Sequence, residues 1–189
     1  MTDLHAVDWS KIPEPVDDGA ARHLPGREMP PVALPATDGG EVALAKLDGL
    51  TVLYAYPMTG RPGEELPEGW DMIPGARGCT PQACTFRDHF AELKALGADH
   101  LFGLSVQDQE YQREVAERLH LPFPLLSDHE LRLASALALP TFEAAGIWLL
   151  KRLTLVIENG RIGHVFYPVF PPDRSAADVV EWLGARQDR

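Results

Sequence analysis

Apolar residues along the chain fall into two kinds of pattern: short continuous runs, and longer stretches in which they recur every three or four positions. The first kind is typical of buried strands and the second of amphipathic helices. The clearest run, residues 50–56, is rich in β-branched and aromatic residues and ends at Pro57, which predicts a central strand buried on both faces. Further strands are predicted at residues 30–35, 41–44, 100–106, 123–127, 152–157 and 162–167, and helices at residues 81–96, 108–119, 128–139 and 175–185. Trp148 is expected to lie in the core rather than in a pocket wall.

Two pairs of these strands are joined by sequences typical of β-hairpin turns. Thr-Asp-Gly-Gly at residues 37–40 separates the first pair, and Asn159-Gly160 lies at the centre of the last. Asn-Gly favours a type I′ turn, whose twist matches that of the strands it joins. The last pair is therefore the most strongly predicted hairpin in the chain.

The order of these elements predicts one domain with an extension. Residues 1–28 show neither strand nor helix periodicity and are expected to form an N-terminal extension packed over the rest. In residues 29–189, strands and helices alternate before an antiparallel hairpin, which predicts an α/β fold with a mixed central β-sheet flanked by helices and an N-terminal β-hairpin. A thioredoxin-like fold with insertions would give this order. Between Pro57 and Gly75, eight of nineteen residues are glycine or proline, so residues 58–75 are expected to be an inserted loop.

The charge and the apolar content argue against two kinds of partner. The formal net charge is −11 and no run of lysine and arginine occurs, so we expect no nucleic-acid partner, because affinity for a phosphate backbone comes mainly from cationic side chains. No apolar run approaches the ~18 residues that a membrane helix needs, and the N-terminus shows no signal-peptide pattern. We therefore expect a soluble, cytoplasmic chain with no membrane partner.

Both cysteines of the chain, Cys79 and Cys84, lie where a helix is predicted to follow the long loop. In a reducing compartment such a pair is more often chemical than structural. Thr80 is the expected N-cap of that helix and Pro81 its first residue. A helix N-terminus and a nearby cation both stabilise a thiolate. Because Pro81 lacks a backbone N–H, we expect a distant cation, Arg152, to supply part of this stabilisation.

The spacing of the two cysteines limits how they can react with each other. In one regular helix, residues five positions apart have Cα atoms roughly 8 to 9 Å apart, given a rise of ~1.5 Å and a rotation of ~100° per residue. A disulfide needs Cα atoms within about 7 Å of each other. A Cys79–Cys84 disulfide therefore requires the first turn of the helix to unwind.

Peroxide chemistry fits this pair of thiols. A thiolate that meets a hydroperoxide becomes a sulfenic acid, and a nearby thiol condenses with that group to form a disulfide. Two other interpretations stay open from the residues alone. In one, both cysteines are small buried apolar residues of a helix; in the other, they exchange disulfides with protein substrates, although the usual Cys-x-x-Cys spacing is absent. No Cys-x2-Cys or His-x3-His pattern supplies further metal ligands, so we expect no metal site.

Several segments of the chain match the signature of one family. They are Tyr54-Ala55-Tyr56-Pro57, Gly78-Cys79-Thr80-Pro81-Gln82-Ala83-Cys84-Thr85-Phe86-Arg87-Asp88, Gly103-Leu104-Ser105-Val106, Pro124-Leu125-Leu126-Ser127-Asp128 and Arg152-Leu153-Thr154-Leu155-Val156-Ile157. Over residues 29–185 the chain thus resembles the peroxiredoxins of the Q type, also called bacterioferritin comigratory proteins. The resemblance implies a thiol-dependent peroxidase that reduces hydrogen peroxide or organic hydroperoxides, with thioredoxin or a similar dithiol as reductant and without a metal, haem or flavin.

The resemblance also implies roles for individual residues. Cys79 matches the peroxidatic cysteine and Cys84 the resolving cysteine, which form an intramolecular disulfide during the reaction. Arg152 matches the arginine that holds the thiolate and polarises the peroxide. Pro57 matches the proline that shields the active site.

Two features depart from the pattern of that family. Its members carry a threonine three residues before the peroxidatic cysteine, where this chain has Ala76, and they join the proline to the cysteine by a much shorter segment than residues 58–75. Thr59 is a candidate for the missing hydroxyl, or else a turn residue. The inserted loop is a candidate lid, dimer contact or source of that hydroxyl. Monomer and homodimer both stay open, as does a non-catalytic redox sensor as an alternative function.

Overall fold

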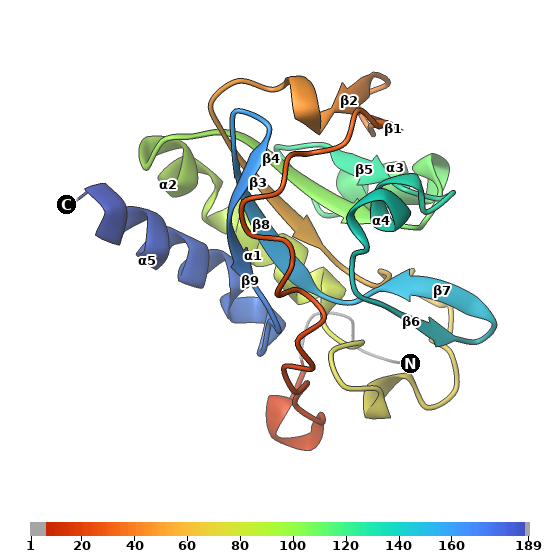
Figure 1. The fold of residues 1–189 in the computed structure, drawn as a ribbon. Coiled ribbons are helices and arrows are strands. Elements are labelled where there is room, and N and C mark those ends of the chain that lie inside the picture. Colours follow the sequence, from red (N-terminus) through yellow and green to blue (C-terminus); the bar gives the residue numbers. More distant parts are fainter. Residues whose placement is uncertain (1–6, 188–189) are drawn as a thin grey trace.

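A computed structural model describes residues 7–187 and contains a five-stranded sheet with two small hairpins (Figure 1). The strand order of the sheet is β5-β4-β3-β8-β9. Its strands are β3 (Leu50–Ala55), β4 (Ala98–Ser105), β5 (Leu125–Ser127), β8 (Leu153–Glu158) and β9 (Arg161–Phe166). β3, β4 and β5 are parallel, β8 is antiparallel to β3, and β9 is antiparallel to β8. The predicted mixed sheet is confirmed, with β3 at its centre.

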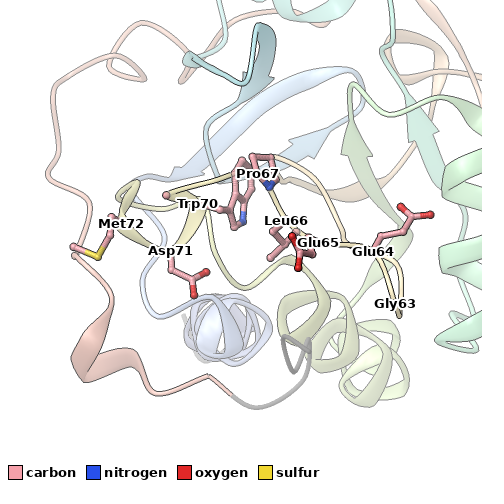
Figure 2. Close-up of a pocket in the computed structure, with 9 residues that line it drawn as sticks. Gly63, Glu64, Glu65, Leu66, Pro67, Trp70, Asp71 and Met72 are labelled. Atoms are coloured by element: carbon pink, nitrogen blue, oxygen red, sulfur yellow. The ribbon is translucent and has the colours of Figure 1, made fainter.

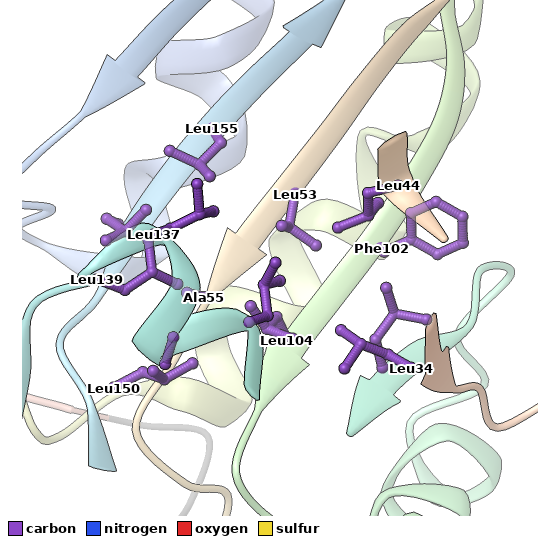
Figure 3. Packing of buried hydrophobic residues seen from close by; sticks show 14 of the residues in the cluster. Leu34, Leu44, Leu53, Ala55, Phe102, Leu104, Leu137, Leu139, Leu150 and Leu155 are labelled. Atoms are coloured by element: carbon purple, nitrogen blue, oxygen red, sulfur yellow. The ribbon is translucent and has the colours of Figure 1, made fainter. Parts of the chain in front are cut away.

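The two faces of the sheet bury different side chains of the same strands. Along β3, Val52 and Tyr54 belong to one buried cluster, while Leu53 and Ala55 belong to the other, as the two-residue period of a strand requires. The helices on the first face are α1 (Cys79–Asp88), α2 (Phe90–Ala95), α3 (Gln109–Arg118) and α5 (Ser175–Gln187). The second face is covered by α4 (Arg132–Leu137) and by the small hairpins. Figure 3 shows leucines from strands and helix meeting there.

The described part of the predicted N-terminal extension, from residue 7 onward, crosses this second face before the chain reaches the hairpin of β1 (Ala33–Pro35) and β2 (Glu41–Ala43) (Figure 1). Residues 1–6 of that extension lie outside the described residues. The backbone of the described segment pairs with the start of β9, because the N–H of Gly26 donates to the carbonyl of Ile162 at 2.7 Å and the N–H of Ile162 donates to Arg27 at 2.8 Å. The segment therefore covers part of the edge strand, whose backbone groups would otherwise be unpaired.

The two predicted hairpins are confirmed, and the structure adds a third. Asn159 and Gly160 have φ values of 47° and 77°, as a type I′ turn requires. The additional hairpin joins β6 (Thr141–Ala144) to β7 (Ile147–Leu150) through Ala145 and Gly146. Trp148 lies on β7 and is 53% exposed, so its assignment to the core was wrong. This hairpin forms its own two-stranded sheet, and only its Leu149 and Leu150 end is buried.

The long helix predicted at residues 81–96 is two helices. α1 ends at Asp88 and α2 begins at Phe90. His89 between them has a ψ of 6°, away from helical values, although its N–H still donates to the carbonyl of Thr85 at 2.9 Å. Within residues 7–187 no helix is both long and apolar enough to span a membrane.

Candidate active site

Cys79 is the first residue of α1, the helix that follows the inserted loop. Gly78 before it has a φ of 107°, and a Cβ atom there would lie 2.5 Å from Trp9 and 2.8 Å from Pro172. Only glycine accommodates both the positive φ and this close approach. Cys79 itself is 4% exposed, so protein groups rather than bulk water form its surroundings.

Helix α1 begins two residues earlier than predicted. Gly78 is its N-cap, so Cys79 lies inside the first turn and Pro81 is the third helical residue. The first N–H groups of a helix have no intrahelical acceptor, and Pro81 has no N–H to offer. The N–H of Gln82 already donates to the carbonyl of Gly78 at 3.0 Å. The N–H groups of Cys79 and Thr80, in the first turn of α1, therefore have no acceptor within the helix and lie at the positive end of the helix dipole.

Arg152 contacts the thiol, as the sequence predicts. Leu153 lies opposite Ala55 in the antiparallel pairing of β8 with β3, which brings Arg152 to the end of β3 where the inserted loop begins. Arg152 is 3% exposed, and its Nη2 lies 3.2 Å from Cys79 Sγ. The same nitrogen donates, at 3.2 to 3.3 Å, to the carbonyl oxygens of Gly75, Ala76 and Arg77. These contacts fix the guanidinium against the sulfur atom.

Gln82 holds the other side of Arg152, although it is not among the residues predicted from the sequence. Its Oε1 accepts a hydrogen bond from Arg152 Nη1, and its Nε2 donates to Ser175 Oγ at 3.1 Å. Gln82 is fully buried, and its position one turn after Cys79, on the same helix face, is the signal that would have identified it. Within residues 7–187 no carboxylate forms an ion pair with Arg152. A thiolate at Cys79 therefore does not compete with a carboxylate for the guanidinium group.

Thr59 is hydrogen-bonded to Gln107 and does not line the cavity beside Cys79. The hydroxyl of Thr59 donates to Gln107 Oε1 at 3.1 Å and its N–H donates to the same oxygen at 2.9 Å. Thr59 thus anchors the start of the inserted loop. Ala76, at the position of the family's threonine, accepts from Arg152 through its carbonyl oxygen. The cavity beside Cys79 is lined by a different hydroxyl residue, Thr80.

Pro57 and Cys84 are the other two residues that the sequence predicts for the site. Pro57 is buried two residues after the end of β3, and its shielding role stays a prediction. Cys84 lies in the second turn of α1, partly exposed, and both cysteines are free thiols. Burial raises the pKa of the Cys84 thiol, and the nearby Arg87 opposes this rise. Because one helix contains both cysteines, the separation of roughly 8 to 9 Å expected between their Cα atoms exceeds the disulfide limit of about 7 Å.

The inserted loop covers Cys79. A cavity of about 10 Å³ beside the thiol is lined from the loop by Met58, Gly60, Leu66 and Trp70. Trp70 begins a short 3-10 helix, η3 (Trp70–Met72), and is 3% exposed. Figure 2 shows Leu66 and Trp70 between Met72 on one side and Glu64 and Gly63 on the other. No group of three or more His, Cys, Asp or Glu residues within the described part of the chain is arranged to hold a metal ion.

The relatives of the chain assign it to a family. The redoxin family matches residues 24–180. Peroxiredoxin Bcp of Escherichia coli is 33% identical over 171 residues, which are 84% of this chain and 94% of that protein. The chloroplastic peroxiredoxin Q of Sedum lineare is 29% identical over 164 residues, which are 86% of this chain and 79% of that protein.

Solved structures show the same architecture. The crystal structure of peroxidoxin BcpB from Mycobacterium tuberculosis has a TM-score of 0.68 and 27% identity, and the match covers 86% of this chain and 97% of that chain. Peroxiredoxin Q of Xanthomonas campestris has the same fold, with a TM-score of 0.64 at 21% identity over 82% of this chain and 90% of that chain. The resemblance inferred from the sequence is confirmed. The chain therefore belongs to the redoxin family, among the Q-type and Bcp peroxiredoxins, which are thiol-dependent peroxidases.

Proposed function

We propose that Cys79 is the thiolate with which this chain reduces hydroperoxides. The observation that carries the proposal is the buried guanidinium of Arg152, whose Nη2 lies 3.2 Å from Cys79 Sγ at the N-terminus of α1. A fixed cation and free N–H groups stabilise the thiolate and the charge that develops on the departing oxygen. Cys79 Sγ attacks one peroxide oxygen, the O–O bond breaks, and the other oxygen leaves as water or an alcohol after taking up a proton. Cys79 is then a sulfenic acid.

Cys84 completes the proposed cycle. After the first turn of α1 unwinds, the Cys84 thiolate attacks the sulfenic sulfur and the S–O bond breaks as the Cys79–Cys84 disulfide forms. The departing hydroxide takes up a proton and leaves as water. Thioredoxin or a similar dithiol would then reduce this disulfide and become oxidised in turn. In this scheme Pro57 shields the site and Thr80, which lines the cavity beside Cys79, supplies the hydroxyl that Ala76 lacks.

The proposal extends to the cellular compartment, the oligomeric state and the reaction partners of the protein. Two free thiols that cycle through a disulfide suit a reducing compartment, so we propose a cytoplasmic enzyme. The scheme places both reacting cysteines in one chain and therefore works equally in a monomer or a homodimer. Its reaction partners are a hydroperoxide and a dithiol reductant.

Peroxide consumption by three proteins tests the proposal. Wild type, Cys79→Ser and Cys84→Ser are supplied with hydrogen peroxide, thioredoxin, thioredoxin reductase and NADPH. We expect Cys79→Ser to consume no peroxide, whereas Cys84→Ser should consume one equivalent and hold a sulfenic acid that dimedone traps. Cys84→Ser is the matched control, since it removes the other thiol of the same helix. Peroxide turnover by Cys79→Ser at the wild-type rate would refute the proposal.

A further inference from the structure

The cavity beside Cys79 leaves very little room for a substrate. Its volume of about 10 Å³ is close to the smallest space that holds one water molecule. Hydrogen peroxide has two oxygen atoms and needs only a small enlargement of this space. A hydroperoxide that carries a ring or a branched alkyl group needs the cover of the cavity to be displaced. What covers the cavity therefore decides which peroxides reach the sulfur atom.

Side chains from the middle of the inserted loop form that cover. Leu66 and Trp70 line the cavity beside Cys79. The Trp70 ring also packs against Phe142 on β6, with the two ring centroids 6.3 Å apart. Asp71, the next residue, forms an ion pair with Arg77 at 3.6 Å. The residues that cover the cavity thus contact both the β6–β7 hairpin and the segment that leads into α1.

The ends of the loop are attached more firmly than its middle. At the start, the carbonyl of Thr59 accepts from Tyr111 Oη at 3.0 Å and the carbonyl of Gly60 accepts from Arg118 Nη2 at 3.0 Å. At the end, the carbonyl of Gly75 accepts from Arg152. The backbone bonds of Trp70 and the residues around it are local turns, such as the N–H of Trp70 to the carbonyl of Pro67 at 3.0 Å. A segment held by local turns and by side-chain packing can open without disturbing the anchored ends.

We propose that Trp70 and Leu66 make the inserted loop a size gate, which admits small hydroperoxides to Cys79 and excludes those with bulky apolar groups. The inference rests on the proposed peroxidase function and adds a substrate class to it. A second pocket of about 250 Å³ is lined in part by Arg152, Phe142 and Tyr167. Cys79 does not line that pocket, so an apolar group bound there does not bypass the gate.

The ratio of two rate constants tests the gate. We would measure second-order rate constants for consumption of hydrogen peroxide and of cumene hydroperoxide by wild type, Trp70→Ala and Leu66→Ala. Wild type should favour hydrogen peroxide by at least about tenfold, and Trp70→Ala should reduce this preference by about tenfold. Trp148→Ala is the matched control, because it removes an exposed tryptophan from the neighbouring hairpin; its ratio should equal that of wild type. Equal wild-type rates with both peroxides, or an unchanged ratio in both loop variants, would overturn the gate.

Labelling of the thiol gives a readout that does not depend on turnover. In proteins that also carry Cys84→Ser, Cys79 is alkylated with iodoacetamide or with a bulky fluorescein maleimide. Trp70→Ala should increase labelling by the bulky reagent about tenfold relative to the small one. If Trp70→Ala does not fold, Leu66→Ala, a smaller truncation, carries the same comparison. Failure of the wild-type protein to consume hydrogen peroxide would refute the peroxidase function, whereas equal access of both reagents in wild type would refute only the gate.

Discussion

Replacing Arg152 by methionine removes the cation beside Cys79 while it keeps much of the length of the side chain. Arg152 is 3% exposed and its Nη2 lies 3.2 Å from the sulfur atom. The thiolate and the developing charge on the leaving oxygen both lose their fixed positive partner. We therefore expect Arg152→Met to react with hydrogen peroxide much more slowly than the wild-type protein.

The expected size of the effect follows from the distance. Two unit charges 3.2 Å apart attract each other by about 1.3 kcal/mol at a dielectric constant of ~80 and by about 5 kcal/mol at an effective value of ~20. Each ~1.36 kcal/mol corresponds to a factor of ten in rate. The buried position of Arg152 favours the larger energy. The rate constant should therefore fall by at least about tenfold and by up to several thousandfold.

Stopped-flow measurement of a single oxidation by hydrogen peroxide checks this prediction. Lys151→Met is the matched control, since the neighbouring cation is more exposed and pairs with Asp18 at 2.6 Å; it should react at the wild-type rate. Arg152→Lys should be intermediate, because it keeps the charge but not the two-pronged donor geometry. Thermal unfolding establishes that each variant is folded. A folded Arg152→Met protein that reacts within about twofold of wild type would refute the role of Arg152 derived from its contact with Cys79.

Two further predictions concern Cys84 and the start of α1. Because burial raises the pKa of the Cys84 thiol, this group is more fully protonated at neutral pH than an ordinary thiol. Disulfide formation after a peroxide pulse should therefore accelerate as the pH rises toward that pKa. Mass spectrometry of quenched samples measures the rate of disulfide formation, and a rate independent of pH would contradict the prediction. Gly78→Ala should lower the free energy of unfolding by about 1 to 3 kcal/mol, because its Cβ would lie 2.5 Å from Trp9 at a φ of 107°. Urea unfolding measures the change, and an unchanged midpoint would show that the helix start tolerates a side chain there.

The parts of the fold that follow from the sequence are those with strong local patterns. β3 is a continuous apolar run, and Asn159-Gly160 specifies the turn between β8 and β9. The β6–β7 hairpin shows no such pattern, since Ile147 and Trp148 are both exposed whereas the next two residues are both buried. An alternation rule cannot detect a strand whose exposure changes along its length. Its Ala-Gly turn is also not one of the pairs that typically mark a hairpin.

The start of α1 shows how tertiary contacts override a local rule. Thr80-Pro81 is a good local signal for a helix start, yet the helix begins at Cys79 after Gly78. The space that only glycine fits at that position is made by Trp9 and Pro172, which are remote in the sequence. Local propensity therefore predicts the presence of the helix, and distant packing determines its first residue.

The residues of the candidate site likewise fall into two groups, those that the sequence predicts and those whose role depends on tertiary contacts. Cys79, Cys84 and Arg152 carry recognisable chemistry and match a family signature, so the sequence predicts a role for each of them. Gln82 is a neutral residue whose role appears only when its two hydrogen bonds are seen. The position of the inserted loop likewise depends on packing, because Trp70 contacts Phe142, a residue of the hairpin that the sequence did not predict.

The central claim is that Cys79 and Cys84 of one chain form the reacting pair. Mass spectrometry of the reduced protein after one equivalent of hydrogen peroxide tests it most directly, with peptides mapped at successive times. We predict a sulfenic acid on Cys79 first, followed by a Cys79–Cys84 peptide from within a single chain, and neither species in Cys79→Ser. Oxidation that begins at Cys84, or that leaves both thiols reduced while peroxide disappears, would contradict the account.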